Sequence, residues 1–374
     1  MASGWSARSA QLRHLWQLPH KVEILGRALA RHVSEETDRT VQHLNKCEER
    51  IANLQSEVGG IESKLGGIQA QAEMLGGHFD QQVLDRIIPR LEEARDILGR
   101  IHDAGEKLAA AIDQSQTVAL RVQRMRLFEQ FGAVDIITDH PVALDSPDHL
   151  VPWGTAQDNS RNERFNARLI SLIPNARLTV LDLGCSGGGQ VRSFIEQGYF
   201  AVGVEGSDYS QQRLRAEWAT IPDFLFTADI TKPFVIQTDK GSGSMRFGVV
   251  TLWEVIEHIR ESDLLALLRN IDNHLMPGGL VIMSVSPNSD VIEGVELHQN
   301  VQPRDWWDQY LHAAGWQDHQ NIVEFLGDDV VRGGENALNS FHFVLSRAQD
   351  KPILTNRMAH LLEPRRTLPC TATR

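Results

Sequence analysis

A glycine-rich turn between an apolar strand and a helical segment constrains this chain more than any other feature. The apolar run Leu178 to Leu183 predicts a buried parallel strand, and Gly-Cys-Ser-Gly-Gly-Gly follows it at 184–189. Glycines let the backbone turn sharply and approach a ligand closely, and the helix expected next presents free N–H groups. Glu205 lies 21 residues after Gly184, at the end of a second apolar run. That spacing brings a carboxylate to ribose hydroxyls in dinucleotide-binding folds, so the sequence predicts a nucleoside-containing cofactor.

The N-terminal region, residues 21–131, has a different periodicity. Its apolar residues alternate in steps of three and four, which predicts a helical coiled coil. Pro89 should kink or interrupt the helix because proline lacks an N–H group. Three Gly-Gly pairs weaken the first seam, and they indicate either local flexibility or close approach of two helices. The two seams comprise Ile51, Leu54, Val58, Ile61, Leu65, Ile68, Ala72, Leu75 and Phe79, and then Leu91, Ala94, Leu98, Ile101 and Leu108.

A long helix with one apolar stripe needs a partner. We therefore expect either self-association or an intramolecular hairpin about Pro89.

The rest of the chain divides by composition. Residues 1–20 form a polar tail, and 132–150 read as a linker because of their glycine, prolines and aspartates. Residues 151–348 alternate strands and helices, which predicts parallel strands joined by crossover helices. Residues 349–374 form a second polar tail, basic at Arg365 and Arg366. The expected strands are Leu178–Leu183, Phe200–Val204, Asp223–Thr227, Phe247–Leu252, Leu280–Ser286 and Phe341–Ser346.

Composition excludes several classes of protein. A net charge of -12 disfavours a nucleic-acid-binding surface, since phosphates attract clustered Lys and Arg. Cys47, Cys185 and Cys370 are too few and too scattered for a disulfide framework or a cysteine zinc site. No apolar run reaches the roughly 20 residues of a membrane span, and the N-terminus lacks the apolar core of a signal peptide. We therefore expect a cytoplasmic protein.

The first motif is an acid followed by small residues at alternate positions: Asp182, Gly184, Ser186 and Gly188. With the ordered segments around Glu205, 227–230, 247–258 and 274–284, it makes residues 152–347 resemble class I S-adenosylmethionine-dependent methyltransferases. The likeness is to domains of the ubiquinone-pathway type, methyltransferase types 11 and 12. Ser186 stands where the family has its middle glycine, and a small residue there is compatible with the turn. The resemblance implies an α/β fold, a doubly wound, mostly parallel seven-stranded sheet of Rossmann-like type preceded by the coiled coil.

The resemblance also implies cofactor-binding roles. Gly184 and its neighbours contact the methionine part of S-adenosylmethionine, and Asp182 orients its ammonium group. Glu205 takes the ribose hydroxyls. Asp229 accepts from the adenine amino group, although an Asp at a strand end also caps turns. Trp253 is the last of the expected cofactor-binding residues. Asp208 is expected to cap a helix rather than to bind the cofactor.

The segment 247–258 ends in Glu254-Val-Ile-Glu257-His258 and resembles the Glu-x-x-Glu-His segment of ubiquinone-pathway and small-RNA 2′-O-methyltransferases. On a helix these three side chains share one face. With His298 as a fourth ligand, Glu254, Glu257 and His258 would hold Mg²⁺ or another divalent cation. The metal-free interpretation places Glu254 beside the cofactor and makes His258 or His298 a general base, because histidine titrates near neutral pH.

Two further segments carry weaker signals. Arg161 or Arg164 would meet the cofactor carboxylate, unless both are merely exposed at a helix start. Trp306 and Trp307 cannot both face one core, so one of them is a candidate wall of the acceptor pocket.

These features predict a methyltransferase acting on oxygen, with a saccharide or small-metabolite acceptor. Methyl transfer depends largely on alignment, with a base when the acceptor is a hydroxyl. The alternative is a coiled-coil scaffold or sensor whose cofactor-binding domain is not catalytic. The set Asp182, Glu205 and Asp229 favours the enzyme.

Overall fold

The computed structural model describes residues 114–241, 243–327, 331 and 339–363, and isolated helical positions at 56, 60, 63, 99, 100, 103, 107 and 110. The chain divides into two compact units, 1–122 and 123–374. In the first unit, residues 114–122 are helical. The two coiled-coil seams, Pro89, Cys47, Cys370, the tail 1–20 and the basic pair Arg365 and Arg366 lie outside the described residues. The coiled coil, its self-association and its hairpin therefore stay predictions.

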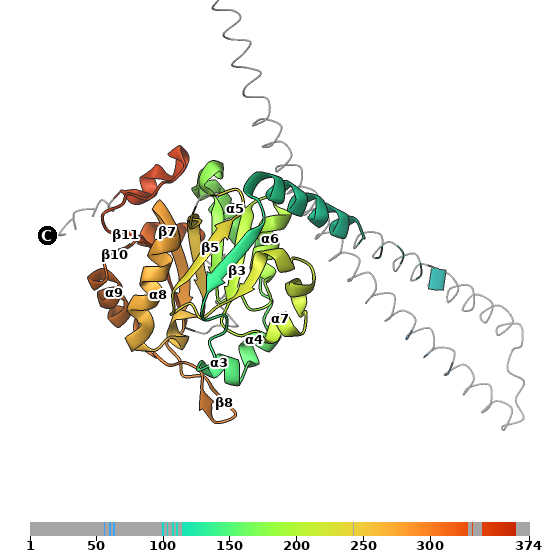
Figure 1. Cartoon of the computed structure of the whole chain (residues 1–374), viewed down its shortest axis with the longest axis horizontal. Coiled ribbons are helices and arrows are strands. Elements are labelled where there is room, and N and C mark those ends of the chain that lie inside the picture. The colour runs from blue at the N-terminus through green and yellow to red at the C-terminus, as the bar shows by residue number, and fades with distance from the viewer. Residues whose placement is uncertain are drawn as a thin grey trace, which may run out of the picture. The chain divides into compact units, whose positions relative to one another are not determined.

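The second unit is built on a seven-stranded sheet of order β10-β11-β7-β6-β2-β3-β4 (Figure 1). The ladders β3/β4, β2/β3, β2/β6 and β6/β7 are parallel, and β7/β11 and β10/β11 are antiparallel. This is the mostly parallel, Rossmann-like sheet that the sequence predicted. Its strands are β2 (Thr179–Leu183), β3 (Phe200–Glu205), β4 (Leu225–Thr227), β6 (Phe247–Trp253), β7 (Leu275–Val285), β10 (Trp316–Asp318) and β11 (Phe341–Arg347).

Continuous apolar runs explain the centre of the sheet. Every residue of β2, β3 and β6 is buried, as expected for parallel strands covered on both faces. From β2 the chain adds β3 and β4 on one side, and it then returns to add β6 and β7 on the other. The order of strands reverses at β2, and open α/β sheets bind ligands outside the carboxyl ends of the strands at such a point.

Helices flank the sheet. Asn162 caps α5 (Glu163–Leu172) with its side-chain oxygen, which accepts from the amides of Arg164 and Phe165. The helix α5 contacts α6 (Gly189–Glu196) and α10 (Gln320–Leu326). The longest of these helices, α8 (Glu261–His274), buries leucines and Ile271 at helical spacing and contacts β5 and β6. The remaining α-helices are α3 (Pro147–Leu150), α4 (Trp153–Gln157), α7 (Tyr209–Gln212) and α9 (Arg304–Ala313).

The segment expected as a linker, 132–150, carries regular structure. A helix ends at Phe131, and Gly132 follows with φ +88°. The strand β1 (Val134–Thr138) pairs antiparallel with β5 (Phe234–Thr238), outside the main sheet. Before β1, the ring of Phe131 packs 4.3 Å from that of Phe200. This segment is therefore folded onto the same unit as the sheet.

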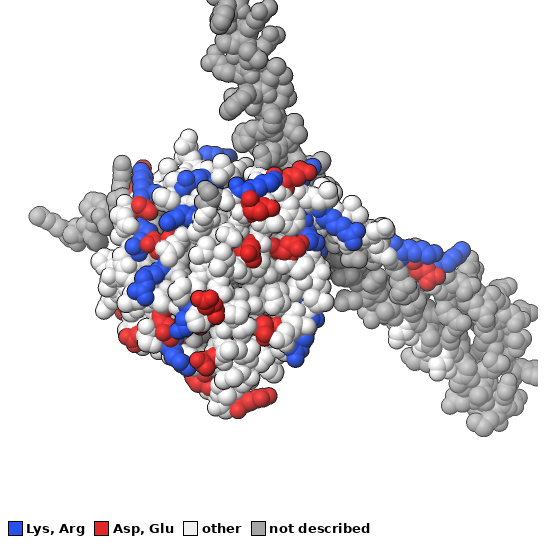
Figure 2. Space-filling view, viewed as in Figure 1, with Lys and Arg blue, Asp and Glu red and all other residues white. Residues whose placement is uncertain are grey.

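Two short strands, β8 (Val291–Ile292) and β9 (Val295–Glu296), form a separate hairpin after β7. Across the part of the chain that the structure describes, no helix combines the length and apolarity needed to cross a lipid bilayer. The face seen in Figure 2 carries acidic and basic side chains interspersed over the sheet-containing unit.

Candidate active site

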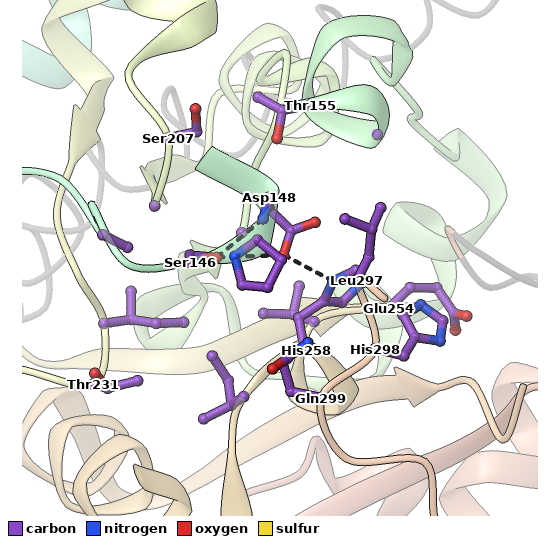
Figure 3. Close-up of a pocket in the computed structure, with 18 of the residues that line it drawn as sticks. Ser146, Asp148, Thr155, Ser207, Thr231, Glu254, His258, Leu297, His298 and Gln299 are labelled. Atoms are coloured by element: carbon purple, nitrogen blue, oxygen red, sulfur yellow. Dashed lines mark hydrogen bonds and ion pairs between the residues drawn. The ribbon is translucent and has the colours of Figure 1, made fainter. Parts of the chain in front are cut away.

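A cavity of about 520 Å³ opens where the strands of the main sheet end. Residues that close or follow five strands line it: Gly184 and Ser186 after β2, Glu205 in β3, Asp229 after β4, Trp253 and Glu254 at β6, and Ser286 after β7. A second group comes from elsewhere in the chain, including Asp148, His258 and His298 (Figure 3). A concave site of this size, with converging polar groups, suits a cofactor and a small acceptor together.

Gly184 turns the backbone from β2 toward the cavity. Its φ is +75°, and a Cβ there would lie 2.4 Å from Cγ2 of Val255. The position therefore requires glycine for its conformation and for its space. Gly188, with φ +86°, occupies the N-cap of α6 and is not among the residues that line the cavity.

Ser186 adopts a left-handed backbone, with φ +47°, at the position where the family pattern has glycine. Hydrogen bonds hold it there. Its amide donates to Oε2 of Glu205 at 2.7 Å, and its carbonyl accepts from Nε1 of Trp218 at 2.8 Å. Its Oγ lies 3.0 Å from the carbonyl oxygen of Asp158. The loop thus keeps the turn without the middle glycine.

Glu205 is buried at the end of β3 and lines the cavity. Burial raises the pKa of its carboxyl, while the backbone amides of Ser186 and Ser207 oppose that rise by donating to it. Its lone pairs not used by these amides can receive donors from a ligand. A diol is such a donor pair.

Asp182 and Asp229 have different surroundings. Asp182 is buried below the loop, where its Oδ1 accepts from Oγ1 of Thr251 at 2.6 Å, and it does not line the cavity. Asp229 does line the cavity, but its Oδ1 also accepts from the amide and the hydroxyl of Thr231. Asp229 therefore caps a turn and also lines the cavity.

Trp253 ends β6 and lines the cavity. Its ring packs edge-on against Phe165 at 5.0 Å. The buried indole Nε1 has no hydrogen-bond partner among the described residues.

The sequence predicted that Glu254, Glu257 and His258 share one face of a helix. The structure shows that they do not. Glu254 has a left-handed backbone, φ +54°, between β6 and a short 3-10 helix η4 (Ile256–His258). Its Oε2 accepts from Oγ of Ser340 at 2.9 Å. The break at Glu254 separates it from the other two, because one left-handed residue ends any helical repeat.

His258 and His298 both line the cavity, and the centroids of their rings lie 4.5 Å apart. Nδ1 of His258 lies 2.9 Å from Oδ2 of Asp148, and Nδ1 of His298 lies 2.5 Å from the carbonyl oxygen of Asn288. Each ring therefore uses Nδ1 for a partner in the protein and leaves Nε2 for the site.

The two histidines have opposite electrostatic surroundings. Burial disfavours the charged form of His258, but the hydrogen bond and charge of Asp148 outweigh burial and raise its pKa to about 9. Burial and the neighbouring charge of His258 lower the pKa of His298. At neutral pH His258 is thus an imidazolium and His298 is a neutral ring.

Glu257 is fully buried beside these rings. Its Oε1 accepts from the amide of Ser286 at 2.9 Å, and Oε2 has no hydrogen-bond partner among the described residues. Burial and the nearby charge of Glu254 raise the pKa of Glu257. Ligand atoms of Glu257, His258 and His298 lie within 4.8 Å of one another. Glu254, part of the predicted ligand set, lies outside this group.

Five residues considered from the sequence lie away from the cavity. Arg161 pairs with Glu163 at 3.1 Å, and Arg164 does not line the cavity. Trp307 is buried in the core and Trp306 stacks on Tyr310, so neither tryptophan forms an acceptor wall. Asp208 takes the N-cap position of α7, without a side-chain capping bond.

The sequence interpretation missed the segment 143–148, which forms one wall of the cavity. Its prolines and aspartates are typical of a linker, and no periodicity marks it as part of a site. Only the pairing of distant segments brings Asp148 to His258, 110 residues further along the chain.

Residues 158–325 match the family model described as a methyltransferase domain. The match covers the parallel strands β2, β3, β4, β6 and β7 of the Rossmann-like sheet. No curated protein matches the chain in sequence.

Several solved structures are similar to this chain. An S-adenosylmethionine-dependent methyltransferase from Clostridium acetobutylicum ATCC 824 is 13% identical, with a TM-score of 0.36, over 54% of this chain and 95% of that one. A 1,6-didemethyltoxoflavin-N1-methyltransferase from Burkholderia thailandensis is 16% identical, with a TM-score of 0.38, over 54% and 84%. A sugar N-methyltransferase from Streptoalloteichus sp ATCC 53650 is 18% identical, with a TM-score of 0.35, over 54% and 92%. These values say nothing about the acceptor of this chain.

Proposed function

We propose that the second unit is an S-adenosylmethionine-dependent methyltransferase that methylates a hydroxyl group of a small polar acceptor. One observation carries the proposal. A single cavity brings Gly184, Glu205 and Trp253 together with a neutral imidazole, His298. The first three suit an adenosyl cofactor, and the last suits removal of a proton from an acceptor hydroxyl.

The residues present fit the cofactor. Glu205 offers a buried carboxylate to hydroxyl donors, and the buried Nε1 of Trp253 has no hydrogen-bond partner in the described part of the chain. Gly184 lines the cavity at the end of β2, and its missing Cβ makes room for Val255, another lining residue. When bound, S-adenosylmethionine supplies an electrophilic methyl group on a sulfonium. The protein has to orient the acceptor, exclude water and accept one proton.

His298 is the better general base of the two histidines. Its Nδ1 must carry a hydrogen, because the carbonyl of Asn288 can only accept, and Nε2 of the neutral ring therefore carries the lone pair. The lowered pKa keeps this lone pair available at neutral pH. The raised pKa of His258 keeps its ring protonated at neutral pH, so His258 places a positive charge beside the acceptor.

The acceptor side of the cavity is lined mainly by groups that form hydrogen bonds. They are Asp148, Glu254, Arg260, Asp263, Asn288, Ser289, Asp290 and Gln299. Such a lining favours a hydroxyl-rich acceptor, a saccharide or a small polar metabolite.

The test has two steps. Calorimetric titration with S-adenosylhomocysteine should give binding, and the full chain incubated in cell extract with isotopically labelled S-adenosylmethionine should give a labelled product by mass spectrometry. His298→Gln should leave the calorimetric affinity unchanged and lower product formation at least tenfold, in line with the loss of a general base. Absence of binding in the unaltered chain would reject the enzyme and leave the coiled-coil scaffold as the better hypothesis. Binding without any labelled product would favour a sensor.

A divalent cation is a second candidate feature of this site. The group Glu257, His258 and His298 fits one once Nε2 of His258 has lost its proton, because Oε2 of Glu257 has no hydrogen-bond partner among the described residues and both imidazoles hold Nδ1 against outer partners. These three residues would hold Mg²⁺ or Mn²⁺, which would supply a positive charge to acceptor oxygens. Product formation that falls with a chelator, returns with Mg²⁺ or Mn²⁺ and loses this response in Glu257→Ala supports the cation. Full activity in the presence of the chelator would reject the cation and leave His298 as a general base that acts without a metal ion.

A further inference from the structure

We infer that Asp148 is a positioning residue, which fixes the imidazole of His258 so that its Nε2 faces the acceptor side of the cavity. The inference rests on the proposed methyl transfer, and it assigns a role to the segment 139–150. We call this segment the strap.

The strap is fastened to the cofactor side of the cavity at two points. The carbonyl of His140 accepts from the amide of Asp229 at 2.9 Å, and the amide of Ala143 donates to the carbonyl of Gly206 at 2.9 Å. Both partners lie in loops that follow strands of the main sheet, β4 and β3. The backbone of the strap is therefore fixed relative to the residues expected to bind the cofactor.

Asp148 is in turn fixed on the strap. Ser146 caps α3, and its Oγ accepts from the amide of Asp148 at 3.3 Å. The same hydroxyl lies 3.4 Å from Oδ2 of Asp148, the oxygen that meets His258 (Figure 3). The neighbouring His149 lies 3.4 Å from Oγ of Ser207. The carboxylate thus reaches His258 from a segment held on both sides.

The side chains of His258 and Asp148 retain 18% and 25% exposure, so water reaches this pair only in part. With Nδ1 held 2.9 Å from the carboxylate, rotation of the ring would break the bond, so Nε2 stays directed toward the site.

The position of His258 also affects the surroundings of the neighbouring His298. Its ring meets that of His298 edge to face, with an interplanar angle of 79°. A tilt of His258 would change the space and the charge beside Nε2 of His298. The strap contacts the loops after β3 and β4 and, through Asp148, also contacts His258. Asp148 therefore aligns the two histidines with the loops expected to bind the cofactor.

The first test is spectroscopic. In the full chain with ¹⁵N-labelled histidine, the ring signals of His258 are assigned by their loss in His258→Gln. Asp148→Asn and Asp148→Ala should both shift these signals, whereas the buried His274 should keep its own as a sign of an intact fold. Asp139→Asn, an exposed strap residue, is the matched control and should shift neither. His258 signals in Asp148→Asn that superpose on those of the unaltered chain would overturn the inference.

The second test separates this inference from the proposed function. With labelled S-adenosylmethionine in cell extract, Asp148→Asn should lower product formation at least tenfold while calorimetric affinity for S-adenosylhomocysteine stays within about threefold. An unaltered product rate in Asp148→Asn would overturn the positioning role and leave the methyltransferase standing. If the unaltered chain forms no product, the methyltransferase proposal fails, and the histidine signals still decide whether Asp148 fixes His258.

Discussion

The backbone amide of Ser186 donates to Oε2 of Glu205 at 2.7 Å. The hydrogen bond joins the left-handed serine of the glycine-rich loop to the acid that ends the neighbouring parallel strand. One carboxylate therefore has two tasks, to hold the loop and to face the cavity. A change at either residue should affect both stability and ligand binding.

Replacing Glu205 by Gln tests its expected contact with the cofactor. Glutamine keeps the shape and an acceptor oxygen for Ser186, but it loses the charge. A hydrogen bond to a charged group is worth about 1.5–3 kcal/mol, so the Kd for S-adenosylhomocysteine should rise about 10- to 100-fold. Calorimetry measures this, with Asp305→Asn, exposed in the first turn of α9, as the control. An equal Kd in both variants would show that Glu205 does not meet the ligand.

Two substitutions of Ser186 should have different costs. Ser186→Ala keeps a side chain in a left-handed backbone and loses the bonds of Oγ to Asp158 and Arg215. Ser186→Gly loses the same bonds but removes the steric cost of about 1–2 kcal/mol. The glycine variant should therefore be the more stable by about 1 kcal/mol in urea unfolding. Equal midpoints for the two variants would argue against strain at this position.

Gly184 should tolerate no side chain while Val255 is present. In Gly184→Ala, a left-handed φ and a contact at 2.4 Å combine, and we expect a loss of more than about 2 kcal/mol. Adding Val255→Ala removes the contact but not the backbone cost, so the double variant should recover only part of the loss. A double-mutant cycle from unfolding curves measures the coupling between the two residues. A coupling near zero would place the cost in the backbone alone.

His274 should make stability depend on pH. It is fully buried, its Nδ1 donates to the carbonyl of Asn270 at 2.8 Å, and burial lowers its pKa. The unfolded chain, with a pKa of about 6.5 at this position, therefore takes up the proton first. This contribution to stability is present above that pH and is lost as the pH falls below it.

Thermal unfolding at pH 8 and pH 5 measures the effect of His274. The unaltered chain should lose more stability between the two than His274→Asn does, and the exposed His312→Asn should behave like the unaltered chain. A drop of the same size in His274→Asn would assign the pH dependence to other groups.

The sequence predicted the centre of the fold better than its edges. Long apolar runs at Leu178–Leu183 and Phe247–Leu252 are visible because a buried parallel strand needs apolar residues on both faces. The strand β10 was missed because three residues, Trp316–Asp318, are too few to show a period. The ladder between β1 and β5 joins segments about a hundred residues apart, which no local pattern encodes.

Some residues of the candidate site could be predicted from the sequence, and others could not. Gly184, Ser186 and Glu205 follow from spacing along one strand-turn-strand unit, and they do line one cavity. Their roles stay predictions until ligand binding is measured. Asp148 had no sequence signal, since its importance comes from a partner 110 residues away. The break at Glu254 was missed because a left-handed residue other than glycine is hard to foresee.

The ladder between β1 and β5 bears on how this domain should be cut from the chain. The family match starts at residue 158, and a boundary chosen there would remove β1, Asp148 and the wall at 143–148. Such a fragment could keep its central sheet and still lack part of the acceptor side. For biochemical work, the smallest useful piece begins upstream of Val134.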